Sequence, residues 1–213
     1  MLDRSYKKAN FDIPRILIGI PSTGVIHAET VSALFGAMVN LSDCQTMLVT
    51  PTGCYIHQLR EFICMMALEE RASHVMFIDS DMIFTPDSIR KLLNHNKEII
   101  GGDYHYKMSD KVSVTKLDPK KIDLEFIEEK NGEKRFATKR PDYPVVVDAV
   151  GTGFMLIKTE ALKKIPKPWF WYELKNGQMI GEDVYFCRHA AKHGVEVWCD
   201  PTLQIGHIGN YIY

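Results

Sequence analysis

The sequence contains no long hydrophobic run, no signal-peptide pattern and no pair of cysteines at a metal-binding or redox spacing. No stretch reaches the roughly 18 consecutive apolar residues that a membrane-spanning helix needs. Residues 1–15 are polar where a signal peptide would have its apolar core. The cysteines are few and scattered, which is typical of reduced thiols; they are Cys44, Cys54, Cys64, Cys187 and Cys199. We therefore expect a cytoplasmic protein without a membrane span.

An excess of charge of one sign is also missing. The chain has 26 basic and 27 acidic residues, and its formal net charge is −1. No overall field therefore attracts nucleic acid or an anionic membrane, and we expect no nucleic-acid partner. If the protein binds a phosphorylated ligand, the positive charge must be supplied locally, and a bound cation is one source of it.

The composition is that of a globular protein with a substantial core. Of the 213 residues, 46% are hydrophobic and 25% are charged. This length fits one domain, and no internal repeat or low-complexity tract divides it. We expect residues 1–213 to form a single domain.

The first hundred residues alternate between short apolar runs and segments of helical spacing. Strands are expected at 15–20, 46–50, 74–78 and 98–100, and helices at 29–38, 56–70 and 86–94. The run 74–78 is almost continuously apolar, which is typical of a strand that is buried on both faces of a parallel sheet. This alternation predicts an α/β fold with a central, mostly parallel but mixed sheet flanked by helices.

The middle of the chain has a different character. Residues 107–144 are charged and rich in turn formers, and Asn131-Gly132 separates two alternating segments at 124–128 and 134–138. Such a dipeptide between alternating segments is a hairpin signal, so we expect a small inserted β-ribbon or lobe. Further strands are expected at 145–147, 154–157 and 195–198, and a helix at 182–193 that Gly194 closes.

Two aspartates, Asp79 and Asp81, follow directly on the buried strand. Ligands of α/β sheets bind outside the carboxyl ends of the strands, so the position suits a site. Alternate residues of an extended segment face the same way, which would let both carboxylates address one cation. Carboxylate oxygens suit Mg²⁺ or Mn²⁺, which also take phosphate oxygens from a substrate. The alternative is an acidic turn at the end of a strand.

Two later segments carry further candidate groups. Glu182 and Asp183 open a helix, where the macrodipole alone stabilises acidic residues by about 0.3–1 kcal/mol. Their functional interpretation is a carboxylate that removes a proton from an acceptor hydroxyl, an effect worth about 10²–10⁴ in rate. His207 lies in a glycine-rich segment and could ligate a metal through a neutral imidazole, although a lone histidine is more often structural.

In combination, these motifs resemble the GT-A fold glycosyltransferases of the DxD type over nearly the whole chain. The matching order is DSDM at 79–82, a loop of small residues at 150–154, GED at 181–183 with a helix ending in His-Gly, and the late His207. Arg60, on the helix before the DSDM strand, also fits a common pattern of these enzymes. The chain is especially similar to small glycosyltransferase domains of large algal (chlorella) viruses.

The resemblance implies transfer of a sugar from a nucleotide diphosphate donor to an acceptor hydroxyl, with inversion. UDP is the preferred carrier and GDP the second, and the acceptor would be a glycan or glycoprotein. Asp81 and His207 would ligate Mn²⁺ or Mg²⁺, and Asp79 would contact the ribose or the metal. Asp183 would be the general base.

The remaining expected contacts follow from the same resemblance. The nucleotide and the donor sugar would be bound by Pro21, Ser22, Thr23, Arg60, Asp79, Ser80, Asp81 and Asp103. The acceptor would be bound by Gly153, Trp171 and Glu182. Trp169 and Trp171 could stack on a sugar face, and the alternative is a packed aromatic cluster.

The chain departs from the family pattern at its end. The basic residues that usually follow the late histidine are missing, because the chain stops at residues 210–213. This implies either a minimal lid over the donor or a domain that belongs to a longer chain.

Three other interpretations stay open. A phosphatase of the haloacid dehalogenase type also uses DxD after a strand with Mg²⁺, but Ile83 stands where Thr or Val is usual, and Asp79 lies late in the chain. A sugar-nucleotide nucleotidyltransferase would carry a Gly- and Lys/Arg-rich loop at 21–25, which is absent. The third is a nucleotide- or glycan-binding domain without catalytic activity.

Overall fold

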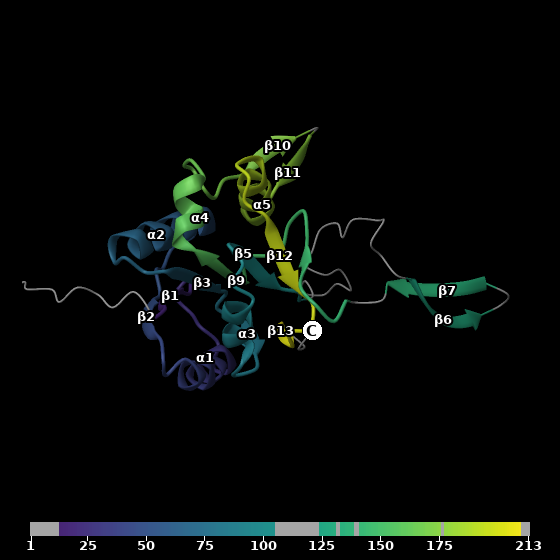
Figure 1. The fold of residues 1–213 in the computed structure, drawn as a ribbon. Coiled ribbons are helices and arrows are strands. Elements are labelled where there is room, and N and C mark those ends of the chain that lie inside the picture. Colours follow the sequence, from purple (N-terminus) through teal and green to yellow (C-terminus); the bar gives the residue numbers. More distant parts are fainter. Residues whose placement is uncertain (1–12, 105–123, 131–132, 139–140, 176, 210–213) are drawn as a thin grey trace, which may run out of the picture.

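The structure is a computed structural model that describes residues 13–104, 124–130, 133–138, 141–175 and 177–209 (Figure 1). The main sheet is built from β1 (Arg15–Gly19), β2 (Gln45–Val49), β3 (His74–Ile78), β5 (Ile99–Gly102), β8 (Val145–Val146), β9 (Phe154–Lys158) and β12 (Val197–Asp200). The helices are α1 (Ala28–Asn40), α2 (Ile56–Glu69), α3 (Ser88–Asn94), α4 (Thr159–Lys164) and α5 (Glu182–Lys192).

The seven strands form one mixed sheet in the order β2-β1-β3-β9-β5-β12-β8. β1 pairs in parallel with β2 and β3, and β12 pairs in parallel with β5. β9 is antiparallel to both of its neighbours, and β8 is antiparallel to β12. Five strands therefore run in one direction and two run against them. The predicted α/β fold with a mixed, mostly parallel sheet is confirmed.

Helices cover both faces of this sheet, and the core is accordingly split in two. In Figure 1, α1 and α3 lie on one side of the sheet, and α2, α4 and α5 lie on the other. Side chains of β3 divide between the two core clusters. Val75 and Phe77 pack with the α2 side, and Met76 and Ile78 pack with the α1 side. All four are fully buried, which explains why the sequence of this strand is continuously apolar.

The contact between β1 and α2 is close enough to require a glycine. A Cβ atom at Gly19 would lie 2.5 Å from Cγ2 of Ile63, which is shorter than any ordinary carbon–carbon contact. Because Gly19 is the last residue of β1, this close packing holds the middle of α2 against the carboxyl end of the sheet. That edge of the sheet is where the predicted site residues lie.

Three small antiparallel pairs complete the part of the chain that the structure describes. β6 (Leu124–Lys130) pairs with β7 (Glu133–Thr138), so the predicted hairpin is confirmed, while its turn and residues 107–123 lie outside the described residues. β10 (Glu173–Lys175) pairs with β11 (Gln178–Ile180), and β13 (Ile205–His207) pairs with β4 (Met82–Phe84). The last two pairs and α4 are not predicted by the sequence, because elements of three to six residues are too short to show a period.

Helix ends and lengths agree with the sequence pattern. Gly194 has a φ of +78°, the left-handed conformation that closes a helix, and α5 ends directly before it. α3 begins two residues after Pro86, at Ser88, where the Thr85 hydroxyl hydrogen-bonds the Ser88 hydroxyl at 2.9 Å. Among the described residues, no helix has the length and apolar character needed to cross a membrane.

Candidate functional site

A cleft of about 320 Å³ opens at the carboxyl ends of β1 and β3. Most of the predicted site residues line it: Pro21, Ser22, Thr23, Arg60, Asp79, Ser80, Asp81, Glu182 and His207. Four others, Asp103, Gly153, Trp171 and Asp183, are not part of its lining. A smaller cavity of about 160 Å³ lies beside the opposite ends of β1 and β2, and it contains none of the predicted residues.

β1 is followed at the cleft by a turn that several hydrogen bonds hold in place. The Ser22 N–H donates to the carbonyl of Pro51 at 3.1 Å, and the Gly53 N–H donates to the carbonyl of Ser22 at 3.0 Å. The Gly24 N–H also donates to the Ser22 hydroxyl at 3.1 Å. These bonds fix residues 21–23 against the loop that leads into α2, so two segments of the cleft wall are held as one unit.

Asp81 and His207 lie in contact although 126 residues separate them. The His207 Nε2 atom is 3.1 Å from Oδ1 of Asp81. The small β4–β13 pair causes this contact, because His207 pairs with Met82 and the Ile208 N–H donates to the carbonyl of Asp81 at 2.7 Å. Both side chains are about 15% exposed, so they reach the cleft without being fully solvated.

This pair has the chemistry of an incomplete metal site. It offers one carboxylate and one imidazole, and Nδ1 of His207 is buried without a hydrogen-bond partner among the described residues. Within the part of the chain that the structure describes, no group of three or more His, Cys, Asp or Glu side chains could hold a metal ion. Mg²⁺ binds through one or two carboxylates together with substrate phosphates and water, so two protein ligands fit a cation that arrives with a diphosphate.

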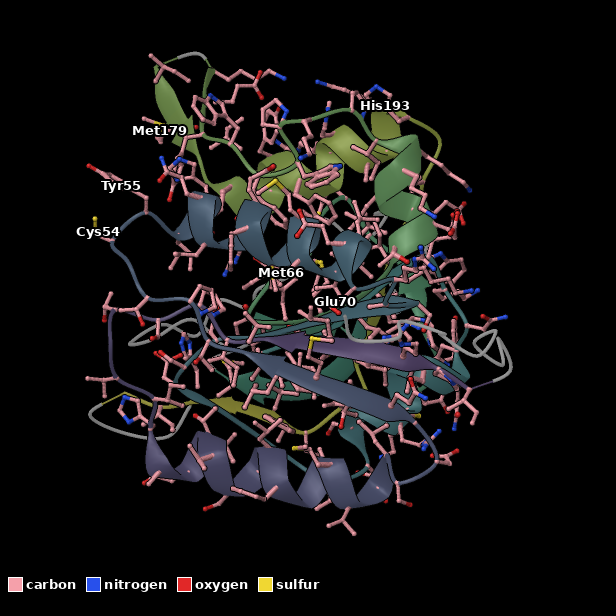
Figure 2. All side chains as sticks on the ribbon, turned by 90° about the vertical axis from the view of Figure 1, so that its left-hand side faces the viewer. Cys54, Tyr55, Met66, Glu70, Met179 and His193 are labelled. Carbon is pink, nitrogen blue, oxygen red and sulfur yellow. The ribbon has the colours of Figure 1, made fainter. Side chains whose placement is uncertain are left out.

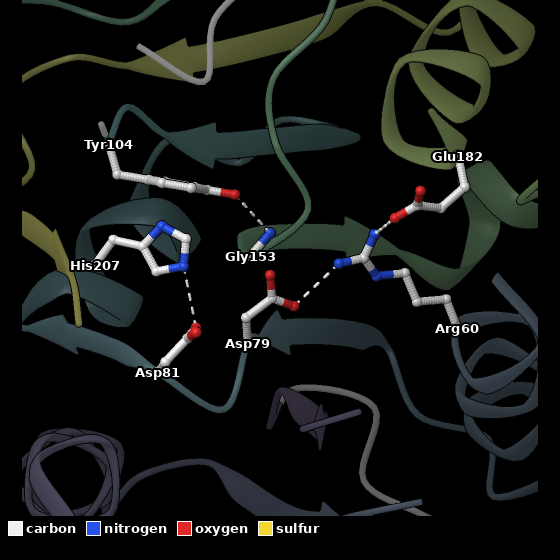
Figure 3. A network of polar contacts seen from close by, with 7 residues as sticks. All are labelled: Arg60, Asp79, Asp81, Tyr104, Gly153, Glu182 and His207. Carbon is white, nitrogen blue, oxygen red and sulfur yellow. Dashed lines mark hydrogen bonds and ion pairs between the residues drawn. The ribbon is translucent and has the colours of Figure 1, made fainter. Parts of the chain in front are cut away.

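Asp79 has a different partner from Asp81 (Figure 3). β3 ends at Ile78 and a turn follows, so Asp79 and Asp81 do not lie on one extended segment. The expectation that extended geometry turns both carboxylates the same way is therefore not met. Oδ1 of Asp79 accepts a hydrogen bond from the Arg60 guanidinium at 3.0 Å. A direct role of Asp79 in metal binding stays a prediction.

Arg60 joins the two sides of the cleft. It is 4% exposed, and it forms ion pairs with Asp79 at the end of β3 and with Glu182 at the start of α5. Burial opposes the charge of Arg60, but Asp79, Glu182 and Asp183 together raise its pKa, so it stays a cation. Its Nε atom is buried without a partner among the described residues. The guanidinium therefore fixes the distance between the DxD turn and the GED helix.

Replacing Arg60 with Met should lower the free energy of unfolding by about 3 kcal/mol, because Glu182 and Asp79 lose their buried cation. This value is the lower end of the roughly 3–5 kcal/mol that removal of one partner of a buried ion pair usually costs, because Asp79 is 28% exposed and can be hydrated. Arg90→Met is the matched control: Arg90 pairs with the exposed Asp43, so its loss should change stability little. Urea unfolding of both variants measures the difference, and equal losses would contradict the structural role of Arg60.

Asp183 follows Glu182 in the first turn of α5 and is partly buried. Burial raises the pKa of this carboxyl, and the neighbouring charge of Glu182 raises it further. The Val184 N–H donates to Oδ1 of Asp183 at 2.7 Å and opposes the shift. A carboxylate with a raised pKa is a stronger base than an exposed one, which is the property a general base needs.

Gly153 packs against the back of the DxD turn. Its carbonyl accepts the Asp79 N–H at 2.9 Å, and its own N–H donates to the Tyr104 hydroxyl at 3.0 Å. Tyr104 is buried and places its ring edge-to-face against His207, with ring centroids 5.7 Å apart. Tyr104 belongs to the strand-end segment 101–104 that the sequence suggests for the donor sugar, but its contacts with Gly153 and His207 were not predicted. It joins β5, the Gly153 loop and His207.

The substitution Gly153→Ala should disturb the site directly. A Cβ atom there would lie 2.6 Å from the Tyr104 hydroxyl and 2.8 Å from Oδ2 of Asp79. We expect a loss of about 1–3 kcal/mol in the free energy of unfolding, as for other overpacked positions. Adding Tyr104→Phe removes the closer contact, so the double variant should be more stable than the sum of the two single changes predicts. Simple additivity in thermal unfolding would contradict this geometry.

The two tryptophans of the 169–172 run lie in different environments. Trp169 is 3% exposed, and its indole N–H donates to the carbonyls of Leu162 and Ile165. It belongs to the core, so the suggestion that Trp169 stacks on a sugar is wrong, and the alternative of packing holds for it. Trp171 is 51% exposed. Its assignment to the acceptor stays a prediction.

The fold and the cleft define an α/β protein with a polar site at the carboxyl edge of a mixed sheet. No protein-family model matches the chain, and no curated protein matches it. Among solved structures, it is similar to A197 from STIV, with a TM-score of 0.59 and 22% identity over 92% of this chain and 86% of that one. It is also similar to S. aureus TarS 1-349, with a TM-score of 0.44 and 10% identity over 88% and 60%. At this identity, the likeness to A197 is one of fold.

Proposed function

We propose that this chain is a divalent-metal-dependent glycosyltransferase that moves a sugar from a nucleotide diphosphate donor, with UDP preferred, to an acceptor hydroxyl with inversion. One observation carries the proposal. The Asp81–His207 contact and the Arg60–Glu182 pair, which come from four separate segments of the sequence, line one cleft of about 320 Å³, and Asp183 directly follows Glu182. A cleft at the carboxyl edge of an α/β sheet is the usual place for such a ligand.

The donor side is the part of the cleft between β1 and the DxD turn. Pro21, Ser22 and Thr23 border the nucleoside, Ser80 completes this side, and Asp103 is a donor contact from outside the cleft lining. Asp81 and His207 would hold Mn²⁺ or Mg²⁺, and such a cation would act as a Lewis acid that stabilises the charge of the departing diphosphate. The balanced net charge of the chain agrees with a positive charge that is supplied at the site alone.

The acceptor side begins at Glu182. Asp183 removes the proton of the acceptor hydroxyl while that oxygen attacks the anomeric carbon on the face opposite the diphosphate. Arg60 holds Glu182 in place so that it can bind a second acceptor hydroxyl, and Gly153 and Trp171 provide the remaining contacts. The acceptor is a glycan or a glycoprotein.

A thermal-shift panel of nucleotides, each with and without Mn²⁺, tests the proposal. UDP with Mn²⁺ should raise the melting temperature more than UDP alone, because ligands that bind only the folded state stabilise it by mass action. Nucleotide binding without transfer or donor hydrolysis would instead indicate a binding domain. Hydrolysis of simple phosphate esters that Asp79→Asn abolishes would indicate the phosphatase.

A further inference from the structure

Four ring-bearing side chains meet at the rim of the cleft, and the proposed chemistry does not use them as a group. The His57 ring lies at the centre of this aromatic cluster. Its centroid is 6.2 Å from that of Tyr55, 5.4 Å from that of Trp171 and 5.2 Å from that of Tyr172, and all three contacts are edge-to-face. We call Tyr55, His57, Trp171 and Tyr172 the aromatic cluster.

The aromatic cluster is continuous with the acceptor side of the cleft. Tyr55 stands between Cys54 and Ile56, and both of these residues line the cleft. Burial, and then the charge of Glu182, raises the pKa of the Tyr172 hydroxyl, and Glu182 also lines the cleft. Figure 2 shows Tyr55 reaching away from the ribbon at the start of α2, on the same side of the molecule as Met179.

Folding alone does not explain this arrangement. Tyr55 is 61% exposed and Trp171 is 51% exposed, whereas Phe170, the neighbour of Trp171, is fully buried. Single exposed aromatic residues are common, but several that touch one another beside a cleft are typical of a binding surface. The core residues of the same run show that the chain can bury aromatic rings here, so the exposed ones are not needed for the core.

The chemistry of the aromatic cluster selects among partners. Tyr55, Trp171 and Tyr172 each combine a flat, largely apolar ring with a polar N–H or O–H group, His57 adds a polar imidazole, and none of the four side chains is aliphatic. Nδ1 of His57 is buried without a partner among the described residues, and the Glu182 carboxylate lies beside Tyr172. A pyranose ring has one apolar C–H face and a rim of hydroxyl groups. It matches such a surface better than an apolar peptide or a lipid chain does.

We propose that the aromatic cluster binds a pyranose unit of the acceptor next to the unit that receives the new sugar. The acceptor is then an oligosaccharide of at least two units, and the protein extends or branches an existing glycan. This inference rests on the proposed function, because it places the reacting hydroxyl at Asp183 and the second unit over Trp171 and Tyr55.

Binding to an array of immobilised oligosaccharides, in the presence of Mn²⁺ and UDP, tests the inference. The wild-type protein should retain a defined set of oligosaccharides and no monosaccharide. Trp171→Ala and Tyr55→Ala should each weaken this binding about tenfold or more, as expected for aromatic anchors, and Trp171→Tyr should restore most of it. Phe35→Ala is the matched control, because Phe35 is a 68% exposed aromatic residue on α1, outside the aromatic cluster.

The outcomes separate the two proposals. If wild-type protein shows the shift with UDP and Mn²⁺ but retains no oligosaccharide, or if Trp171→Ala binds as tightly as wild type, the inference is overturned and the proposed function stands. If Phe35→Ala weakens binding as much as Trp171→Ala, the aromatic cluster is likewise rejected as the site. If wild-type protein shows no nucleotide-dependent shift, the proposed function fails and the inference fails with it.

Discussion

Changing Asp183 to Asn should abolish sugar transfer and leave nucleotide binding close to that of the wild-type protein. The substitution keeps the size of the side chain and the acceptor oxygen for the Val184 N–H, and it removes only the basic carboxylate. Loss of a general base costs about 10²–10⁴ in rate. The release of nucleoside diphosphate, compared with and without acceptor, measures the effect, and calorimetry with Mn²⁺ measures donor binding.

Asp148→Asn is the control for this experiment. Asp148 pairs at 2.8 Å with Arg188, which lies on α5 as Asp183 does, and Asp148 does not line the cleft. Its substitution should leave the rate of transfer within about twofold of wild type, since it is remote from the acceptor. Full transfer activity of Asp183→Asn would mean that the base lies elsewhere or that the enzyme retains configuration.

The environment of Asp183 also fixes the sign of the pH dependence. Burial, and then the charge of Glu182, raises the pKa of Asp183 above that of an exposed aspartate, about 3.9. Only the ionised form can accept a proton, so transfer should fall as the pH drops through this raised pKa. The acid limb of the rate profile should therefore lie at a higher pH than an exposed aspartate would give.

The sequence predicts the regular part of the fold well because long amphipathic and apolar segments carry a periodic signal. The strand His74–Ile78 lies where its apolar run predicts, and α2 ends within one residue of its predicted end. The three-residue strands β4 and β13 carry no such signal. They bring His207 to Asp81, so only the family resemblance, and not the spacing of the residues, suggested this contact.

Side-chain partners across the cleft could not be read from one sequence. Arg60 and Glu182 are 122 residues apart, and nothing in either segment indicates that they form an ion pair. The turn after Ile78 likewise separates the partners of Asp79 and Asp81, whereas an extended segment would have pointed them the same way. The 169–172 run divides into two buried aromatic residues followed by two exposed ones for a similar reason, because tertiary packing and not local sequence decides which ring enters the core.

Changing Asp81 to Ala should remove the Mn²⁺-dependent part of nucleotide binding. His207 would be left as one neutral imidazole, and a diphosphate in the cleft would face the charges of Asp79 and Glu182 without a bridging cation. Changes in the outer shell of metal sites already cost about 10–100-fold in affinity, so loss of a direct carboxylate ligand should cost at least about 100-fold. Titration calorimetry of UDP, with and without Mn²⁺, should give the same weak affinity in both conditions for this variant.

Asp87→Ala separates this effect from a general loss of negative charge. Asp87 precedes α3, pairs with Lys91 and is 49% exposed, so its removal should leave the Mn²⁺ dependence unchanged. The effect of Asp81→Ala should stay confined to the Asp81–His207 pair, because Asp79 forms its ion pair with Arg60 and not with that pair. The Arg60 ion pairs should therefore persist in Asp81→Ala, and the protein should unfold with nearly wild-type cooperativity. Undiminished affinity for UDP with Mn²⁺ would reject Asp81 as the metal ligand, and with it the assignment of the cleft to a metal-bound diphosphate.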